Sequence, residues 1–408
     1  MFDKLQRNKW LIAMSASGIH ICIGSVYAWS VLTRPIMVDM GFTLSQTTWT
    51  FSLAILMLGL SAGFLGSFAE KIGPKKSGLL AMLFWVTGLL GTAYALSIHN
   101  LTLLYLFYGI IGGIGLGIGY ITPVSTLVKY FPNRPGFATG LAIMGFGFAS
   151  LIAGPLMQYL VAQVGLVNTF IILGVIYLVI MGASSLYLKA PQPKHSTRTT
   201  KDRSTMYVHT HGMLANDAMK TWQFGALWWV FFINITCGIG LLSLASPMAQ
   251  EAIGMTPAAA ASLVGVIGIF NGGGRIAWST ISDYLGRAQT YILFFIIEIV
   301  AFYLLAQTNS ALTFQILILL IITCYGGGFA CMPAYLADLY GIRQLSTIHG
   351  RILTAWGLAG IAGPMLVSYF HEAGYGYTTA LECFAALFVL NTIIAIVLKL
   401  YGKRELHN

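Results

Sequence analysis

The chain has 408 residues, of which 57% are hydrophobic and only 8% are charged, whereas soluble domains are about one quarter charged. This composition excludes a soluble globular protein, because no soluble core could absorb that much apolar surface. The formal net charge of +10 does not indicate nucleic-acid binding, since the basic residues lie in separate polar segments and not on one folded face.

The apolar residues form long runs that recur along the chain. Crossing the hydrocarbon core of a bilayer, which is about 30 Å thick, takes roughly 20 such residues in a helix. The runs therefore predict an all-α membrane protein with twelve transmembrane helices, at about residues 10–36, 46–68, 77–98, 101–129, 137–162, 166–189, 224–250, 257–281, 289–307, 311–337, 349–370 and 377–400.

The basic residues predict the orientation of these spans. If the N-terminus is cytoplasmic, 20 of the 22 lysines and arginines lie on the cytoplasmic side, leaving Arg34 outside and Arg275 within a span. This asymmetry is the positive-inside pattern. We therefore expect a multi-pass protein of the cell (inner) membrane with both termini in the cytoplasm. The first run follows the N-terminus without a cleavage pattern and is expected to remain as the first span.

The first span carries two polar side chains on one helical face, His20 and Tyr27, which are seven residues apart. A histidine near the middle of a membrane is a natural proton carrier, because its unperturbed pKa lies near neutrality. The alternative is a neutral buried histidine that is hydrogen-bonded to a backbone or hydroxyl group. His20 is therefore one candidate for proton coupling.

A charged loop follows the second span and has a counterpart after the eighth. Its spacing of small residue, acid, base, glycine and basic pair is that of the loop signature of the major facilitator fold. Glycine allows a tight turn there, and the acid can receive a helix N-terminus. We expect a cytoplasmic latch between helices, the alternative being an ordinary charged loop. This gating motif comprises Gly66, Glu70, Lys71, Gly73, Lys75, Asp283 and Arg287.

Glycines in the fourth span resemble part of a dinucleotide-binding fingerprint, at Gly113, Gly115 and Gly117. That fingerprint must follow a strand and open a helix. Within an apolar span, small residues instead allow helices to approach closely. The five cysteines also lie inside apolar runs and show no ligand spacing, so we expect no disulfide, metal site or cofactor.

The longest polar stretch divides the chain into a six-helix half at 1–189, a cytoplasmic linker at 190–222 and a second six-helix half at 223–408. The halves echo one another at an offset near 210 residues. The glycine-rich segment that ends at Pro123 matches the one that ends at Pro333, and Pro155 matches Pro364. Such a repeat is the architecture of the major facilitator fold, with the substrate site at the midplane between the halves.

Arg275 is the most informative residue, because it lies well inside the eighth span. A cation there costs at least about 2.5 kcal/mol on insertion scales, so intramembrane ionisable residues are functional candidates. Its anion could be Glu298 or Glu382, the acids of the ninth and twelfth spans, in a structural ion pair. We favour a substrate carboxylate held by the planar guanidinium.

Two further polar residues accompany this arginine. Asn271 lies one turn earlier on the same face and can donate or accept beside a bound carboxylate. The glycines at 272–274, which separate Asn271 from Arg275, either loosen the helix or allow close packing. Glu298 is the second candidate for proton coupling, the alternative being a protonated or locally paired acid on the lipid side.

Three segments together resemble a known family. Residues 24–30 (GSVYAWS), residues 130–140 (YFPNRPGFATG) and residues 270–275 (FNGGGR) are similar to segments of the monocarboxylate transporters and the related bacterial oxalate/formate antiporter family. Together with the order of the spans, the resemblance covers essentially the whole chain. It implies that Arg275 binds a carboxylate. It also implies an aromatic and apolar pocket made of Tyr27, Tyr120, Phe146, Tyr325, Phe329, Leu353 and Trp356.

The chain departs from these families at three places. Oxalate carriers have a lysine where this chain has Trp356, which leaves one cation and favours a monoanion. Animal monocarboxylate carriers have an aspartate where this chain has Asn271, and a lysine in the first span where it has apolar residues. Their proton route is therefore not transferable.

These observations predict a secondary active transporter, and not an enzyme, since no H-E-x-x-H motif occurs. We expect a monomer in membrane lipid that carries a small monocarboxylate such as lactate, pyruvate or formate together with a proton, by alternating access. Exchange against a counter-anion, as in oxalate/formate antiport, is the alternative that the sequence leaves open, and a channel is not excluded by it.

Overall fold

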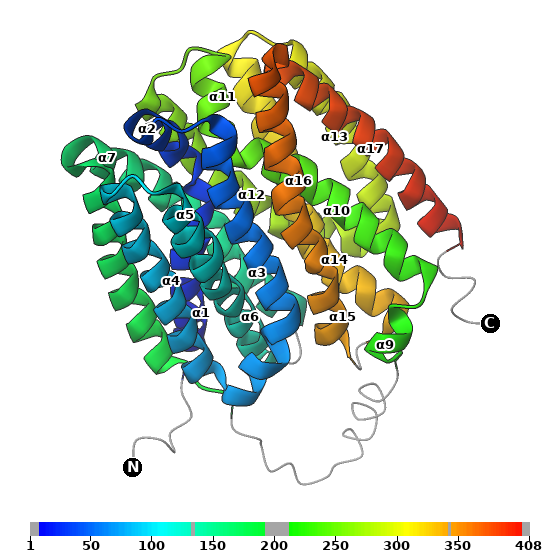
Figure 1. Ribbon diagram of the computed structural model, residues 1–408. Coiled ribbons are helices and arrows are strands. Elements are labelled where there is room, and N and C mark those ends of the chain that lie inside the picture. The colour runs from blue at the N-terminus through cyan, green and yellow to red at the C-terminus, as the bar shows by residue number, and fades with distance from the viewer. Residues whose placement is uncertain (1–7, 132–134, 192–211, 342–343, 402–408) are drawn as a thin grey trace, which may run out of the picture.

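The computed structural model describes residues 8–131, 135–191, 212–341 and 344–401, and these are almost entirely helical (Figure 1). The N-terminal elements are α1 (Lys9–Gly24), η2 (Ser25–Ala28), α2 (Ser30–Met40), α3 (Leu44–Ile72), α4 (Pro74–Ser97), α5 (Leu101–Leu104), η3 (Tyr105–Gly112), α6 (Gly113–Tyr130) and α7 (Pro135–Tyr187). The C-terminal elements are α9 (Ala215–Ala218), α10 (Trp222–Ser243), α11 (Ala245–Glu251), α12 (Pro257–Leu285), α13 (Arg287–Gln307), α14 (Ala311–Tyr340), α15 (Leu345–Ile352), α16 (Thr354–Phe370), η4 (His371–Tyr375) and α17 (Gly376–Tyr401).

The described residues contain 10 helical stretches that are long and apolar enough to cross a membrane. Two of them, 48 and 55 residues long, each far exceed the roughly 20 residues that one crossing takes. The first is α7, which is interrupted at Gly165 (φ 78°), and the second contains η4, with Gly374 at φ 86°. The multi-span helical prediction is confirmed, and the count of twelve stays a prediction.

Polar caps and glycine turns set where these helices begin and end. Thr43 and Gln46 form a reciprocal capping box at the start of α3, and Thr256 accepts the Ala259 N–H at the start of α12. Gly73 (φ 84°) and Gly286 (φ 92°) follow the same two helices. Only glycine adopts such conformations without strain, so α3 and α12 end in matching turns.

Three predicted spans are not continuous helices. The span predicted at 10–36 is broken by the turn η2 and continues as α2 to Met40. The span predicted at 224–250 is broken at Leu244 (φ −121°), and the one at 349–370 begins earlier and is broken at Leu353. The hydropathy pattern does not predict these breaks, because hydropathy does not change at a break whose backbone groups are satisfied within the protein.

The N-terminal and C-terminal helices meet along two close helix pairs. In Figure 1, α3 lies beside α16, and their backbones approach closely at Gly59 and Gly357: a Cβ added at Gly59 would lie 2.5 Å from the Gly357 Cα. The pair α7 and α12 approaches similarly at Gly147, where an added Cβ would lie 2.9 Å from the Gly272 Cα. Small residues therefore permit the contact of the two sets of helices.

The outer surface of the described helices is apolar. Leu83 on α4, Val179 on α7 and Ile393 on α17 are each more than half exposed. Exposed apolar side chains on several helices would be unfavourable in water, and they fit the hydrocarbon of a bilayer.

The Gly59→Ala substitution tests the contact of α3 with α16. The new methyl group would meet backbone atoms of Gly357, which cannot rotate away, so we expect a loss of about 1–3 kcal/mol, the usual cost of overpacking. Thermal unfolding of the protein in detergent measures the effect. Gly225→Ala is the matched control, because it lies in α10 with no atom near its added Cβ. Equal stability of the two variants would contradict the close contact.

Candidate functional site

The guanidinium of Arg275 belongs to α12, a helix that packs against α7 of the N-terminal helices and α14 of the C-terminal helices. The residue is buried on α12, with 1% of its surface exposed. Its Nε donates to the Asn271 Oδ1 at 3.2 Å, and its central carbon lies 5.0 Å from the centroid of the Phe329 ring. Within the described residues, neither Nη1 nor Nη2 donates a hydrogen bond. Both terminal nitrogens are buried donors that require an acceptor.

Neither candidate acid neutralises this arginine. The Glu298 Oε2 accepts from the Asn234 Nδ2 at 3.3 Å, and the Glu382 Oε1 accepts from the Gln307 Nε2 at 2.9 Å. No ion pair to Arg275 occurs among the described side chains. The geometry therefore excludes a structural arginine–glutamate pair with either acid in this state.

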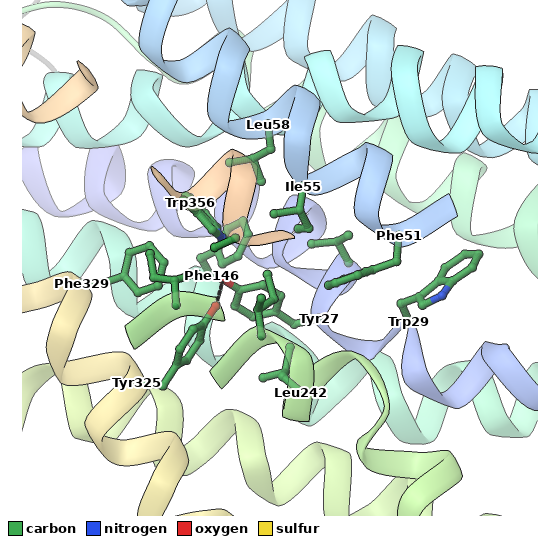
Figure 2. Close-up of a cluster of buried hydrophobic side chains, with 14 of the residues drawn as sticks. Tyr27, Trp29, Phe51, Ile55, Leu58, Phe146, Leu242, Tyr325, Phe329 and Trp356 are labelled. Atoms are coloured by element: carbon green, nitrogen blue, oxygen red, sulfur yellow. Dashed lines mark hydrogen bonds between the residues drawn. The ribbon is translucent and has the colours of Figure 1, made fainter. Parts of the chain in front are cut away.

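Aromatic rings form a continuous buried cluster (Figure 2), and Phe329 of this cluster lies beside the guanidinium. The Tyr27 ring lies 4.9 Å from that of Phe146, and the Phe329 ring lies 4.8 Å from that of Trp356. The Tyr120 ring contacts both Phe146 and Trp356, at 5.5 and 5.1 Å. These side chains come from η2, α6, α7, α14 and α16, so the cluster draws on both sets of helices.

A hydroxyl pair joins the two sides of this cluster. The hydroxyl of Tyr27, on η2, lies 2.8 Å from that of Tyr325, on α14, and Figure 2 shows the contact as a dashed line. The hydroxyls of Tyr27 and Tyr120 lie near enough to Arg275 to interact with its charge, although neither makes a hydrogen bond of ordinary length with it. The cluster is thus apolar with hydroxyl groups on the side of the cation.

Leu353, the remaining pocket candidate, lies at the break between α15 and α16. It is buried, and its backbone carbonyl accepts the Trp356 N–H at 3.0 Å. The break therefore places the start of α16, and with it the Trp356 ring, within the aromatic cluster.

The atoms without partners in this region are mainly donors. Besides the two Arg275 nitrogens, the Asn271 Nδ2 and the Trp356 Nε1 are buried and make no hydrogen bond within the described residues. Leaving a buried donor unsatisfied costs about 1–3 kcal/mol each. A cation accompanied by neutral donors, with no carboxylate beside it, is an arrangement that suits an anion.

The glycines beside Arg275 serve close packing. The helix α12 runs without interruption from Pro257 to Leu285. An added Cβ at Gly272 would touch the Phe148 ring at 3.0 Å, and one at Gly274 would lie 2.5 Å from the Thr323 carbonyl oxygen. The sequence leaves two roles open for these glycines, a bend or close packing. The structure supports the second, because the glycines let α12 approach both α7 and α14 closely.

His20 lies on α1 beneath the Tyr120 ring and is completely buried. Its Nε2 lies 2.9 Å from the Tyr120 carbonyl oxygen, and its Nδ1 lies within hydrogen-bond distance of the Ala142 carbonyl oxygen. The ring centroids of His20 and Tyr120 are 5.4 Å apart. The structure thus connects His20 to the aromatic cluster around Arg275.

Glu298 lies elsewhere, on α13 within the C-terminal helices. It is also completely buried, and its Oε2 accepts a hydrogen bond from Asn234 of α10. Asn234 was not predicted from sequence, although an asparagine in the middle of an apolar run is a usable signal. The structure therefore separates the two proton-coupling candidates.

The gating motif is described in part. Gly73 and Gly286 occupy the equivalent turns after α3 and α12, and Arg287 binds both Asp283 and the Ser282 hydroxyl. The Arg287 Nε also lies 3.7 Å from the Asp338 Oδ2 at the end of α14, a partner that sequence reasoning missed. The second copy therefore ties α12, α13 and α14 together.

The first copy is less completely described. Gly66 lies on α3, where an added Cβ would lie 3.8 Å from the Ile121 side chain of α6. Lys71 lies in the last turn of α3, and Lys75 in the first turn of α4. The side chain of Glu70 lies outside the described part, so its predicted latch role is untested.

At the end of the molecule formed by α2 and α11, the upper end in Figure 1, hydrogen bonds join the two sets of helices. Arg34 of α2 donates to the Gln250 Oε1 at 3.0 Å. The Ser45 N–H and hydroxyl both donate to the Glu372 carboxylate, at 2.7 and 2.6 Å. We call these contacts the distal closure. They connect the two sets of helices at this end of the molecule.

The substitution Asn271→Asp tests whether the neutral side chain at this position leaves the Arg275 guanidinium free to bind an anion. An aspartate at this position would place a carboxylate one turn from Arg275, where it would compete with a bound anion. We expect the affinity for a carboxylate at neutral pH to fall at least about tenfold and to recover as the new acid is protonated. Anion binding at several pH values measures this, and Asn271→Ser is the uncharged control. Unchanged binding by Asn271→Asp would place the anion elsewhere.

A family model described as Major Facilitator Superfamily matches residues 14–297 and again residues 229–407. Among similar proteins, an uncharacterised MFS-type transporter of Escherichia coli (strain K12), YhjX, is 29% identical over 87% of this chain and 87% of its own length. The oxalate:formate antiporter of Oxalobacter formigenes is 24% identical over 91% of this chain and 87% of its own. Monocarboxylate transporter 14 of Homo sapiens is 21% identical over 95% of this chain and 90% of its own length.

A solved structure has the same fold. It is the crystal structure of a bacterial homologue of the human lysosomal transporter Spinster, in an inward-facing and unoccupied conformation. The TM-score is 0.74 over 95% of this chain and 96% of that one, at 13% sequence identity. At this identity the match concerns the fold alone.

Proposed function

The chain belongs to the major facilitator superfamily, and on this premise we propose that it is a secondary active transporter of small monocarboxylates of the lactate, pyruvate or formate class. The observation that carries the proposal is the buried guanidinium of Arg275, whose terminal nitrogens have no acceptor within the described residues. A carboxylate satisfies both nitrogens at once and neutralises the charge.

The surroundings of the arginine favour a small anion with one charge. Among the described residues, Arg275 is the one buried lysine or arginine. Its guanidinium lies over the Phe329 ring, which in turn contacts the Trp356 ring. A second carboxylate would have no cation to receive it, and burying an unpaired charge is costly. The aromatic cluster leaves an apolar environment for the short carbon chain, while the Tyr27 and Tyr120 hydroxyls are available to its oxygen atoms.

Transport would proceed by alternating access around this site. We propose that the two longest helical stretches each contain two crossings, which gives twelve spans in two halves, at 1–189 and 223–408, connected by residues 190–222. The distribution of basic residues favours cytoplasmic termini and a cell-membrane location. In this orientation the distal closure faces outward, and its rupture would open the outward path.

Coupling to a proton is our preferred energy source. Carrying a carboxylate together with a proton moves no net charge through a low-dielectric protein, which spares the cost of transferring an ion. Exchange is the second candidate, favoured by the similarity to an oxalate:formate antiporter. An exchanger would change between its two conformations only when a bound anion neutralises Arg275.

The experiment is uptake of radiolabelled lactate, pyruvate, formate and oxalate into proteoliposomes. One set of vesicles has an inward proton gradient, and another is preloaded with unlabelled anion. Accumulation of a monocarboxylate that follows the proton gradient is the expected result. Uptake that requires preloading and ignores the gradient identifies an exchanger, and preference for oxalate would contradict the monoanion proposal.

Replacing Arg275 by alanine should abolish transport of every carboxylate. Removing one partner of a buried charge pair costs about 2–5 kcal/mol, which is a loss of affinity of roughly 30-fold or more. Arg275→Lys keeps the charge and loses the planar donor pair, so we expect an intermediate loss. Lys220→Ala is the control for removal of an exposed cation. Transport at the normal rate by Arg275→Ala would refute the proposed site.

A further inference from the structure

We propose that His20 is the binding site of the co-transported proton, and that the imidazole takes up this proton when a carboxylate neutralises Arg275. The inference rests on the proposed carboxylate site and deepens it, because it names the second ligand of the same central region. It starts from the two ring nitrogens of His20 and from the groups that they face.

Both nitrogens of His20 face backbone carbonyl oxygens. One is the Tyr120 oxygen on α6 and the other is the Ala142 oxygen on α7, so the ring bridges two helices. A carbonyl oxygen only accepts hydrogen bonds, and a neutral imidazole has a single N–H. One nitrogen of the neutral ring therefore faces an oxygen without a proton between them. Only the imidazolium form donates to both carbonyls.

Burial opposes this protonated form most strongly, and the charge on Arg275 adds to that opposition. His20 is completely buried, and Arg275 of α12 is the charged residue whose field reaches it. The neighbouring titratable group on α6 is the Tyr120 hydroxyl, and the α7 groups that face the imidazole are the Ala142 carbonyl and the Phe146 ring, which do not titrate. Two positive charges in one buried region are unfavourable unless an anion lies between them.

A bound carboxylate removes the part of this opposition that comes from the charge on Arg275. Once the guanidinium is paired, the added proton on His20 completes two hydrogen bonds and meets no net positive charge. By linkage, a proton that binds more tightly in the presence of the carboxylate also makes the carboxylate bind more tightly. The loaded protein then carries arginine, carboxylate and proton, which together have the same charge as the empty protein with a neutral histidine. The loaded and the empty protein therefore change conformation with the same net charge, as electroneutral symport of an anion and a proton requires.

Glu298 has a different environment. It is hydrogen-bonded to Asn234 of α10, and among the described side chains it makes no ion pair with Arg275. Protonation of this acid would not respond to a carboxylate at Arg275 through the contacts described. Glu298→Gln is therefore the matched control, since it removes a buried titratable group and keeps the shape of the side chain.

The test is proton uptake on binding, measured in weakly buffered detergent solution with a pH-indicator dye. Lactate, pyruvate and formate are each added to the purified protein near pH 7. We expect the wild type and Glu298→Gln to take up about one proton per bound carboxylate, and His20→Gln to bind without proton uptake. The apparent affinity of the wild type should rise by up to about tenfold per unit of falling pH, and that of His20→Gln should not change.

Each outcome decides between the inference and its alternatives. Carboxylate binding without proton uptake by the wild type overturns the His20 proposal and leaves the carboxylate site standing, and this result needs no variant to fold. Undiminished proton uptake by His20→Gln also overturns the proposal. So does a loss of proton uptake in Glu298→Gln that does not occur in His20→Gln. If none of the carboxylates binds to the wild type, the proposed function fails first.

Discussion

The central constraint on this structure is a positive charge buried among helices that would otherwise be apolar. Arg275 is held by one hydrogen bond to Asn271 and by the face of the Phe329 ring, and its terminal nitrogens have no acceptor within the described residues. The protein thus keeps a buried cation incompletely satisfied, which is unfavourable unless a ligand completes it. The neighbouring features supply neutral donors, hydroxyl groups and apolar rings, and no acid.

The helix contacts around this charge are compatible with movement. The N-terminal and C-terminal helices approach through glycines, at Gly59 against Gly357 and Gly147 against Gly272, where few side chains interlock. The Tyr27–Tyr325 hydroxyl pair and the distal closure also join the two sets, through hydrogen bonds that another conformation can exchange. By contrast, Arg287 ties α12, α13 and α14 within one set. This distribution favours motion of the two sets as bodies around the site.

The all-helical fold followed from the sequence, because long apolar runs have few solutions in a membrane. The importance of Arg275 followed from the cost of a charge within such a run. The breaks at η2, Leu244 and Leu353 did not follow, since a break leaves hydropathy unchanged. The contacts of Glu372 with Ser45 and of Arg287 with Asp338 join residues near helix ends that are far apart in the sequence, and no local pattern marks them.

The aromatic cluster shows the limit of sequence reasoning at the site itself. The resemblance to carboxylate carriers named Tyr27, Tyr120, Phe146, Phe329 and Trp356, and the structure brings these rings together. The residue types alone could not have selected them from the 53 aromatic side chains of the chain (24 Phe, 20 Tyr and 9 Trp). Their roles toward a substrate stay a prediction.

The most direct test of the account compares a carboxylate with its uncharged amide. Lactate and lactamide have nearly the same shape, but only lactate can form a charge-assisted pair with the buried guanidinium. Calorimetric titration of the purified wild-type protein with each compound measures their affinities. Binding of lactate, or of pyruvate in the matching pair with pyruvamide, without binding of the amide is the predicted result. Equal affinity for the acid and its amide would contradict a site organised around Arg275.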